Sequence, residues 1–574
     1  MCNRIIFPWL VAAMFVAACN QRQPATEPAD LVLKNGAIYT VTSDQEWVEA
    51  IALRDGLIVY LGTDSGADVF VGPDTGVIEL QGRMVMPGIV DGHMHPLRGA
   101  VKELYHCNFP FTAKPKGVRD AVARCVAEQQ EAEWIVGGQW DSGFFERFDI
   151  ESPRQFLDQV SPDKPVLLKD DSLHNVWVNS KALQAAGITA DTLDPEGGKI
   201  LRDDDREPNG VLLEAAAKIM NEYVPEYTPE QQVAAAQEFC RIANAYGITG
   251  AKAASTYEKE IAALHTADKE GQLSVHVAVS MRTVDGARSG PLDYDALEAK
   301  RKKYASSHVH TNFVKIFLDG VPTPARTAAM LAPYTPDPRT GERTDGGPLL
   351  VPISALAQDL TELDSRGFTV KMHAAGDRSV RIALDAIQAA REANGDSGLR
   401  HELAHAGYVD PVDIPRFAEL NAVADLSPVI WHPSPIIAAV VSAVGEERGR
   451  KYWPVRDFIH AGVSLLAGSD WPAAVPDANP WTGIEALVSR KDPRGTTPGA
   501  LWPEQSITLE EALAIYTVGG ARALRMEDRI GSLEIGKSGD LIVLDRNLFE
   551  VPVEDISDTR VEMTFFEGRL VQQR

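Results

Sequence analysis

Short apolar runs recur through the middle of the chain, and each is followed by a longer stretch in which apolar residues recur every three or four positions. The first pattern is typical of buried strands and the second of amphipathic helices. Eight such strand and helix units alternate, which favours an α/β fold with a closed (β/α)8 TIM barrel over an open doubly wound sheet. The expected strands are 87–95, 248–253, 275–281, 313–318, 369–373, 401–405, 422–426 and 463–467.

Both ends of the chain show a different pattern, in which apolar and polar residues alternate over short runs broken by Asn-Gly and Asp-Gly turns. Such runs indicate strands joined by tight turns, and the first of them covers 31–41. Strand-rich segments on either side of an α/β middle imply one small β-sandwich built from both termini. We expect this domain to comprise 31–84 with 530–574, and the barrel domain to span 85–529.

About 150 residues separate the first expected barrel strand from the second, far more than a usual connection between a strand and its helix. An inserted α/β subdomain over 100–228 is the simplest explanation. The chain returns to the barrel through a helix with a well-marked start. Its N-cap is Thr228, Pro229 follows in the first turn, and Gln231 stands three positions after the cap.

An apolar segment over 5–18 follows a basic residue and ends in small residues before Cys19. It is short for a membrane span, so we interpret 1–19 as a secretory signal peptide. The small residues before the cysteine resemble a bacterial lipobox. This resemblance implies acylation of Cys19 and, with Asn20 next to it, a periplasm-facing place on the outer membrane, whereas ordinary cleavage and release into the periplasm is the alternative. The polar stretch 20–30 is expected to be a tether.

The formal net charge of −25 restricts the partners. Nucleic acids and anionic membrane surfaces attract basic faces, so electrostatic binding to either is not expected. A lipid anchor is then the one membrane attachment that we expect. Whether the protein forms a homodimer stays open.

Three cysteines remain outside the leader, Cys107, Cys125 and Cys240. An odd number cannot pair completely within one chain. A disulfide between Cys107 and Cys125 suits an oxidising compartment, and buried free thiols are the alternative.

The first expected barrel strand ends in His93-x-His95. Alternate residues of a strand point to the same face, and the catalytic side chains of such barrels come from the carboxyl ends of the strands. Two neutral imidazoles aimed at one point suit zinc or another divalent metal. A polar turn that happens to hold two histidines is the alternative.

Further ionisable residues fall at the corresponding places of other strands. Lys315 lies in the fourth strand, His373 ends the fifth, His405 ends the sixth, and Asp470 follows the eighth. Taken singly, such a histidine is typical of a hydrogen-bonded core residue, and Lys315 suits an ion pair or a snorkelling side chain. Their recurrence on strand ends favours a shared site for one or two divalent ions, with zinc as the expected metal.

These motifs resemble those of the amidohydrolase superfamily, and within it the amidohydrolase-3 group of YtcJ-like metal-dependent hydrolases. The matching stretches are 93–95, 174–183, 315–320, 373–378, 402–406 and 468–472. The resemblance implies two metal positions bridged by a carboxylated lysine. The ligands would be His93, His95 and Asp470 for one metal, His373 and His405 for the second, and Lys315 for the bridge.

Five further residues are candidates for substrate contact, with structural support or packing as the alternative: His174, Asn179, Asp319, Arg378 and Trp471. The chain departs from many relatives over 426–432, where Leu-Ser-Pro-Val-Ile-Trp-His stands in place of a Gln-Pro pair. Substrate specificity therefore does not carry over from the resemblance.

We therefore expect a hydrolase that cleaves a carbon–nitrogen, amide-type bond of a small molecule by metal-activated hydroxide. The same nucleophile attacks other electrophilic carbons, so an ester or lactone hydrolase and a deaminase are alternatives. Outside enzymes, the rival is a lipoprotein that only binds metal or substrate. Asp470 counts against this rival, because a binding module needs no general base to move protons.

Overall fold

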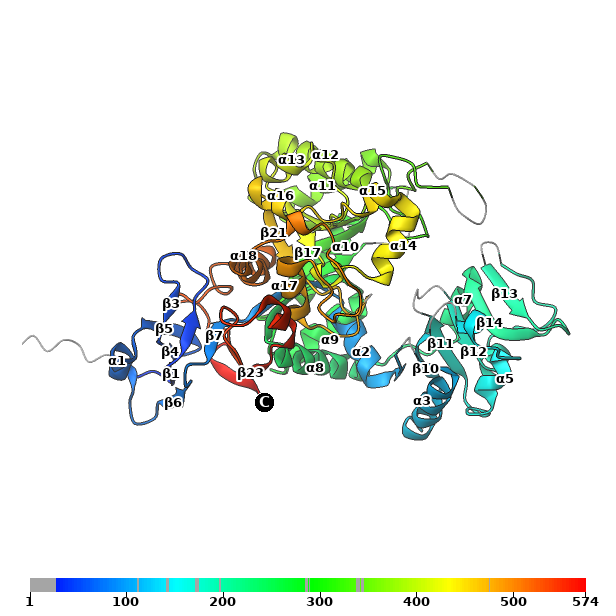
Figure 1. Cartoon of the computed structure of the whole chain (residues 1–574), viewed down its shortest axis with the longest axis horizontal. Helices are drawn as coiled ribbons and strands as arrows, with labels where there is room; N and C mark the ends of the chain where they lie inside the picture. Colours follow the sequence, from blue (N-terminus) through cyan, green and yellow to red (C-terminus); the bar gives the residue numbers. More distant parts are fainter. Residues whose placement is uncertain are drawn as a thin grey trace, which may run out of the picture.

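The computed structural model describes most of the chain after the expected leader. The described residues are 27–110, 113–140, 144–170, 175–195, 198–283, 288, 290–336, 341, 345–473 and 475–574. The expected signal peptide with Cys19, most of the expected tether, and His174 lie outside them, so the assignments made there stay predictions. Figure 1 shows three parts along the long axis of the molecule, with the barrel between a small β unit and a separate sheet.

The central part is the predicted α/β barrel, a sheet of eight parallel strands whose spatial order follows their order along the chain. The strands are β8 (Ile89–Met94), β15 (Ile248–Thr256), β16 (His276–Arg282), β17 (Val309–Phe317), β18 (Thr369–Ala374), β19 (Glu402–His405), β20 (Val423–Leu426) and β21 (Ser464–Ala467). Each overlaps one of the eight predicted runs, and the TIM-barrel prediction is confirmed. The strands are almost wholly buried, as expected for a parallel sheet with both faces covered.

Helices cover the outside of the barrel (Figure 1). They are α8 (Pro229–Ala245), α9 (Glu258–Lys269), α10 (Tyr294–Tyr304), α11 (Ile353–Ser365), α12 (Asp377–Asn394), α13 (Ile414–Glu419), α14 (Pro435–Val444), α15 (Glu446–Gly449), α16 (Val455–His460), α17 (Pro480–Ser489), α18 (Leu509–Ala514) and α19 (Gly520–Leu524). The start of α8 forms as predicted, since the Thr228 hydroxyl accepts from Gln231 N at 3.3 Å and the Gln231 side chain accepts from Thr228 N at 2.9 Å. No helix within the described ranges is both long and apolar enough to cross a membrane.

Hydrogen bonds between the first strand and the segment after the last strand close the barrel at its carboxyl end. Asp470 N donates to His93 O at 2.7 Å, and His95 N donates to Trp471 O at 2.7 Å. The buried Asp91 carboxylate accepts from His93 N at 3.0 Å and from a backbone N–H after β21 at 3.1 Å. The closure therefore fixes the backbone on both sides of the predicted metal site.

Two sheets built from both ends of the chain form the predicted β-sandwich. One sheet is β5 (Leu57–Gly62), β4 (Ala50–Arg54), β1 (Leu31–Lys34) and β6 (Gly76–Glu79), and the other is β24 (Arg569–Gln573), β23 (Val561–Phe566), β22 (Leu541–Leu544), β7 (Met84–Pro87), β2 (Ala37–Tyr39) and β3 (Trp47–Val48). They share a buried apolar core that includes Leu33, Ile51, Val543 and Phe565. Because β22 pairs with β7, which leads directly into β8, the sandwich is joined to the first barrel strand. The residue boundaries of the domains stay predictions.

The predicted strand over 31–41 is wrong in one respect, because it splits into β1 and β2, which belong to different sheets. Asn35 between them has a φ of 55°, in the left-handed region that asparagine adopts more readily than most residues. The turn at this residue carries the chain from one sheet of the sandwich to the other.

The chain between α2 (Pro96–Tyr105) and α8 forms the predicted insertion, a mixed sheet with short helices at the right of Figure 1. Its strands, in spatial order, are β13 (Gly198–Arg202), β14 (Pro208–Glu214), β12 (Asn175–Val178), β11 (Val166–Asp170), β10 (Ile135–Trp140) and β9 (Cys107–Asn108). Its helices are α3 (Pro115–Glu128), α4 (Phe144–Arg147), α5 (Pro153–Asp158), α6 (Ser180–Ala185) and α7 (Ala215–Ile219). Leu168 and Trp177 enter one apolar cluster, and their neighbours Leu167 and Val176 enter another, so both faces of this sheet are covered.

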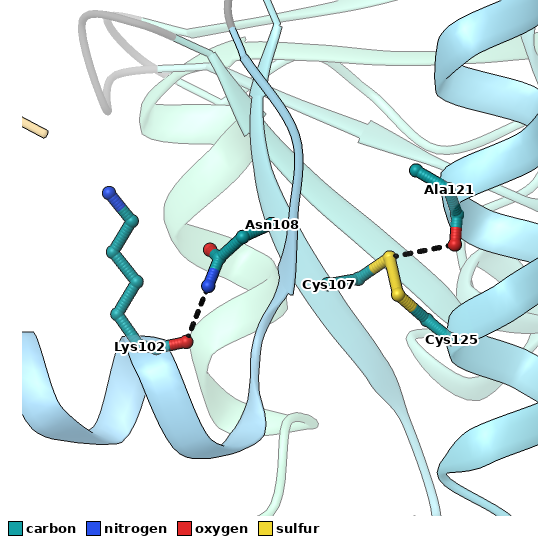
Figure 2. Close-up of a disulfide and its surroundings, with 5 residues drawn as sticks. All are labelled: Lys102, Cys107, Asn108, Ala121 and Cys125. Carbon is teal, nitrogen blue, oxygen red and sulfur yellow. Dashed lines mark hydrogen bonds between the residues drawn. A yellow bond between two sulfur atoms is a disulfide. The ribbon is translucent and has the colours of Figure 1, made fainter. Parts of the chain in front are cut away.

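Of the two cysteine alternatives, the disulfide is the one that the structure contains. Cys107 on β9 and Cys125 on α3 are bonded, with their Cα atoms 5.7 Å apart, as Figure 2 shows. Cys240 is a buried free thiol on α8. The bond ties the edge strand of the inserted sheet to the helix that packs on it.

Candidate active site

The six predicted ligands come from five barrel strands. His93 lies in β8 and His95 follows it, Lys315 lies in β17, His373 lies in β18, His405 ends β19, and Asp470 follows β21. Parallel strands of a barrel end at the same edge, where catalytic side chains of such barrels gather. The fold therefore directs all six toward one mouth of the barrel.

Three donor atoms converge between β8 and the segment after β21. Asp470 Oδ1 lies 3.2 Å from His95 Nε2 and 3.6 Å from His93 Nε2. Ligands held ~2.0–2.1 Å from a tetrahedral zinc ion lie about 3.3 Å from one another. The spacing of two imidazole nitrogens and one carboxylate oxygen therefore fits a single divalent metal.

His405 extends this group toward the neighbouring strands. One ligand atom each of His93, His405 and Asp470 lies within 4.8 Å of the other two. The rings of His373 and His405 are 4.6 Å apart between centroids, and those of His93 and His405 are 5.0 Å apart. The four histidines and Asp470 form one continuous cluster of metal-binding donors.

Two of the histidines have one ring nitrogen held by an acceptor outside the cluster. His93 Nδ1 lies 2.7 Å from Asp425 Oδ2, and His373 Nε2 lies 2.9 Å from Gly320 O. Carboxylate and carbonyl oxygens only accept, so we assign the proton to these nitrogens and the lone pair to the opposite nitrogen of each ring. Each ring therefore has one free lone pair, as a metal ligand requires.

Burial sets the protonation states of the cluster. It lowers the pKa of every histidine in it, well below the usual value for His93 and His405. Burial alone would raise the pKa of Asp470, but its hydrogen bond with His95 and its interactions with His93, His95 and Lys315 outweigh this and lower it. Neutral imidazoles beside an ionised carboxylate are the states in which these side chains bind a divalent metal.

Lys315 is a buried lysine, with 1% of its surface exposed. Burial, and then the positive charge of Lys371, lowers its pKa to about 7. Its positive charge contributes to lowering the pKa of each histidine of the cluster and of Asp470, so the amine lies near enough to act on all of them electrostatically. A lysine with this pKa is uncharged in a large fraction of molecules at neutral pH.

A buried chain of charges lies next to the cluster, and its members were not predicted. Lys371 Nζ contacts Asp425 Oδ2 and lies 2.9 Å from Glu402 Oε2, while Lys252 Nζ contacts the other oxygen of Glu402. All four side chains are 0% exposed. Two lysines and two carboxylates have no net charge, and mutual pairing is what makes buried charges tolerable. Because Asp425 also accepts a hydrogen bond from His93, this row of buried charges is connected to the metal cluster.

The signal that could have identified these four buried charged residues is an isolated charge inside an apolar strand. The register places Lys315, Lys371 and Glu402 side by side on β17, β18 and β19. Buried charges are rare unless they are paired or bind metal. Lys371 and Glu402 could therefore have been interpreted, like Lys315, as members of an ion pair or a metal site. The partners themselves could not be predicted, because Lys252 and Glu402 are 150 residues apart.

Asp425→Asn should weaken metal binding by about 10–100-fold, the usual loss when a metal-binding histidine loses its carboxylate support. The amide keeps the size of the side chain but removes the charge that holds the His93 ring. Competition with a chromophoric chelator measures the affinity. Asp359→Asn is the matched control, because Asp359 is equally buried but pairs with Arg288 instead of a predicted ligand. Equal losses in both variants would contradict a specific role for Asp425.

Two residues of the cluster have a left-handed backbone. The φ angle is 75° at His405 and 56° at Asp470. Residues other than glycine rarely adopt this region, and the cost is tolerated where the surroundings enforce it, often at functional sites. Hydrogen bonds from Asp470 N to His93 O at 2.7 Å and from Trp453 Nε1 to His405 O at 3.2 Å hold both turns.

Comparison with known proteins identifies the family. A model described as "Amidohydrolase family" matches residues 76–572. The chain belongs to the amidohydrolase family. It is 28% identical to the putative amidohydrolase YtcJ of Bacillus subtilis, over 94% of this chain and 98% of that protein. It is 27% identical to the N-substituted formamide deformylase of Arthrobacter pascens, over 96% of this chain and 99% of that protein.

The fold of this amidohydrolase is also found among solved structures. An uncharacterised metal-dependent hydrolase from Pyrococcus horikoshii matches with a TM-score of 0.72 and 24% identity, over 91% of this chain and 99% of that chain. With the donor cluster, the family makes the protein a metal-dependent hydrolase of carbon–nitrogen bonds other than peptide bonds. The predictions of the enzyme class and of metal binding are confirmed, whereas the role of each ligand stays a prediction.

Two residues of this amidohydrolase that were predicted to contact substrate, Asn179 and Trp471, are buried and make structural contacts. Asn179 is 0% exposed, and its side-chain oxygen accepts from Val166 N at 2.9 Å and from the first turn of α6 at 3.0 Å. Trp471 is 1% exposed and packs against α2, where a Cβ added at Gly99 would lie 2.2 Å from the indole ring. These contacts favour support and packing, the alternatives to substrate contact, for both residues.

Asp319 also has the contacts of a supporting residue, and its contact with substrate stays a prediction. It is 2% exposed, and its two oxygens accept four hydrogen bonds. The donors are Ala329 N at 2.8 Å, Ala375 N at 3.1 Å, Gly376 N at 3.0 Å and Ser379 Oγ at 2.6 Å. Three of these bonds end on Oδ2 and one on Oδ1, so most acceptor positions of this carboxylate are already used within the protein. Asp319 therefore holds the end of β17 against the start of α12, close to the contact between His373 and Gly320.

Arg378 has a different environment from the predicted ligands. It lines a cavity of about 580 Å³ together with residues of α12 and of the loop that contains Met330 and Gly346. Among the described residues that line this cavity, none is a predicted ligand. Substrate contact by Arg378 stays a prediction, and His174 lies outside the described residues.

Cationic and aromatic side chains at the mouth of the barrel are further candidates for substrate contact that were not predicted. Arg98 on α2 and Arg282 at the end of β16 lie over the ring of Tyr257, at 5.3 and 5.0 Å from its centroid. Arg282 also lies 4.9 Å from the centroid of the Phe317 ring. All four side chains lie at or just after the carboxyl ends of the first four strands, where candidate ligands also occur. This position is the signal that could have identified them.

Proposed function

We propose that this amidohydrolase hydrolyses an amide-type bond of a small molecule at a zinc centre. The ligands would be His93, His95 and Asp470 for one ion, His373 and His405 for a second, and carboxylated Lys315 as the bridge. The observation that carries the proposal is the spacing of 3.2 and 3.6 Å between Asp470 Oδ1 and two imidazole nitrogens. The lowered pKa of Lys315, about 7, supports the bridge, because only an uncharged amine takes up carbon dioxide.

The protein's own residues would orient the site and move the protons. A bound divalent metal would supply a Lewis acid that polarises the scissile carbonyl and promotes ionisation of water. Asp470 is ionised and borders the predicted ligands, so its carboxylate would accept a proton from water and return it to the leaving nitrogen. Asp425 would keep the His93 ring in its orientation throughout.

N-formyl and N-acyl compounds are the substrates that we propose to test first. The support is the formamide deformylase relative, which matches almost the whole chain. A screen of N-formyl, N-acyl, cyclic-imide and ester compounds with zinc-loaded protein tests this proposal. We expect turnover of at least one N-formyl or N-acyl compound, and its loss after treatment with a chelator. Turnover confined to esters or lactones, or confined to deamination, would replace the proposal with the corresponding alternative.

We also propose that the protein is an outer-membrane lipoprotein anchored through Cys19. The support is the apolar segment 5–18 and the small residues that precede the cysteine. Acyl chains would be the anchor, so Cys19→Ala should leave the protein soluble or unprocessed. Fractionation of cells fed a labelled fatty acid measures this, with Cys240→Ala as the control that keeps the lipid. Wild-type protein found wholly in the soluble fraction would contradict the anchor.

A further inference from the structure

A second cluster of metal-binding side chains lies at the end of the barrel opposite the active site. His276 is the first residue of β16, His308 directly precedes β17, and Glu567 lies in the turn between β23 and β24. One ligand atom of each lies within 4.8 Å of the other two. The amino ends of barrel strands lie away from the catalytic mouth. The cluster is therefore separate from the active site, and it lies where the barrel meets a sheet of the sandwich.

Carboxylates orient both histidines of this cluster. His308 Nδ1 lies 2.6 Å from Asp268 Oδ1, and His276 Nε2 lies 3.2 Å from Asp540 Oδ2. The ring of His93 in the active site is held in the same way. A carboxylate on one ring nitrogen is typical of histidines whose other nitrogen binds a metal.

The other ring nitrogens and Glu567 are the donors that a metal would use. His276 is 0% exposed, and its Nδ1 has no hydrogen-bond partner among the described residues. A buried polar atom without a partner is costly, so a ligand at this nitrogen would remove a penalty. His308 Nε2 lies 3.3 Å from Glu567 Oε2, which matches the ~3.3 Å between two ligands of one tetrahedral zinc ion. The other oxygen of Glu567 lies 3.6 Å from Arg529, so Oε2 remains directed at the histidine.

We propose that His276, His308 and Glu567 bind a zinc-like divalent cation that ties the sandwich to the barrel. Two imidazoles and one carboxylate are a donor set that zinc uses, with water in the fourth position. The side chain of Glu567 is 30% exposed, which gives an ion and its water a route of entry. The cation bridges two barrel strands and the turn after β23, so it stabilises the folded chain, the only state in which these ligands meet.

The zinc content of the full chain tests this proposal. Protein stripped with a chelator is reloaded with zinc, and bound zinc is counted by elemental analysis after free ion is removed. Glu567→Gln and His308→Gln should each bind one zinc ion fewer than the wild type. Glu562→Gln is the matched control, because Glu562 lies on the adjacent β23 but outside the cluster, and it should bind as many ions as the wild type. Zinc should also raise the unfolding temperature of the wild type more than that of Glu567→Gln.

Equal zinc content and equal thermal response in the wild type and both variants would overturn the proposal. The cluster would then be an ion-pair network in which His308 links Asp268 to Glu567. If circular dichroism shows that a variant is unfolded, crystals of the wild type grown with zinc decide the question. An anomalous peak between His276, His308 and Glu567 supports the site, and a map without one rejects it.

Discussion

Asp470→Asn should lower turnover by about 10²–10⁴-fold, the usual contribution of a general acid and base. A side-chain amide does not accept a proton from water at neutral pH and cannot deliver one to the leaving nitrogen. Asparagine matches aspartate in size, and the hydrogen bond from Asp470 N to His93 O uses the backbone alone, so the barrel should stay closed. Steady-state kinetics on the amide substrate measure the loss.

Metal content must be measured on the same samples, because Asp470 is also a predicted ligand. Asp477→Asn is the matched control. Asp477 is an exposed carboxylate on the same segment after β21, where it accepts from Asn479 N at 3.1 Å, and its variant should keep wild-type turnover. Wild-type turnover by Asp470→Asn would remove this carboxylate from the mechanism.

Lys315→Ala should lose one metal ion and lower activity by more than about 100-fold. A loss of about 100-fold is the largest usually seen when only the hydrogen-bond partner of a metal ligand is removed. Lys315 is predicted to bridge both ions, so its removal acts on each. The native side chain is buried with a pKa of about 7, which favours the uncharged amine over an ammonium that would repel a metal. Elemental analysis and kinetics on the same preparation give both quantities.

Rescue of Lys315→Ala by small carboxylates would distinguish a metal-bridging role of Lys315 from a purely structural one. Formate or acetate can enter the space that the shortened side chain leaves, and both the second metal and part of the activity should return. The same additives should not rescue Asp470→Asn, because asparagine leaves no comparable space. A Lys315→Ala protein with two metal ions and full activity would instead favour the ion-pair alternative for this lysine.

The barrel, and the placement of the candidate ligands at the ends of its strands, could be predicted from the sequence because the signals are local. The apolar run of β8 and the His93-x-His95 pair that ends it are contiguous, and His405 ends β19 in the same way. A buried parallel strand requires an apolar run, and the catalytic residues of such barrels lie at the carboxyl end of that run. One short segment therefore indicates both the strand and its candidate ligands.

The charge chain beside the metal cluster could not be predicted in the same way, because its contacts are long-range. Asp425 and His93 are 332 residues apart, and only closure of the barrel brings β20 close to β8. Sequence motifs also do not indicate how deeply a side chain is buried. Asn179 belongs to a stretch that resembles the family, yet it is fully buried as the N-cap of α6.

Anomalous diffraction at the zinc edge, from wild-type crystals loaded with zinc, tests the metal centre most directly. We predict a strong peak bounded by His93, His95 and Asp470, a second beside His373 and His405, and electron density for a carboxylated Lys315 between them. Folded, zinc-loaded crystals without a peak at these residues would contradict the assignment of this cluster as the metal centre.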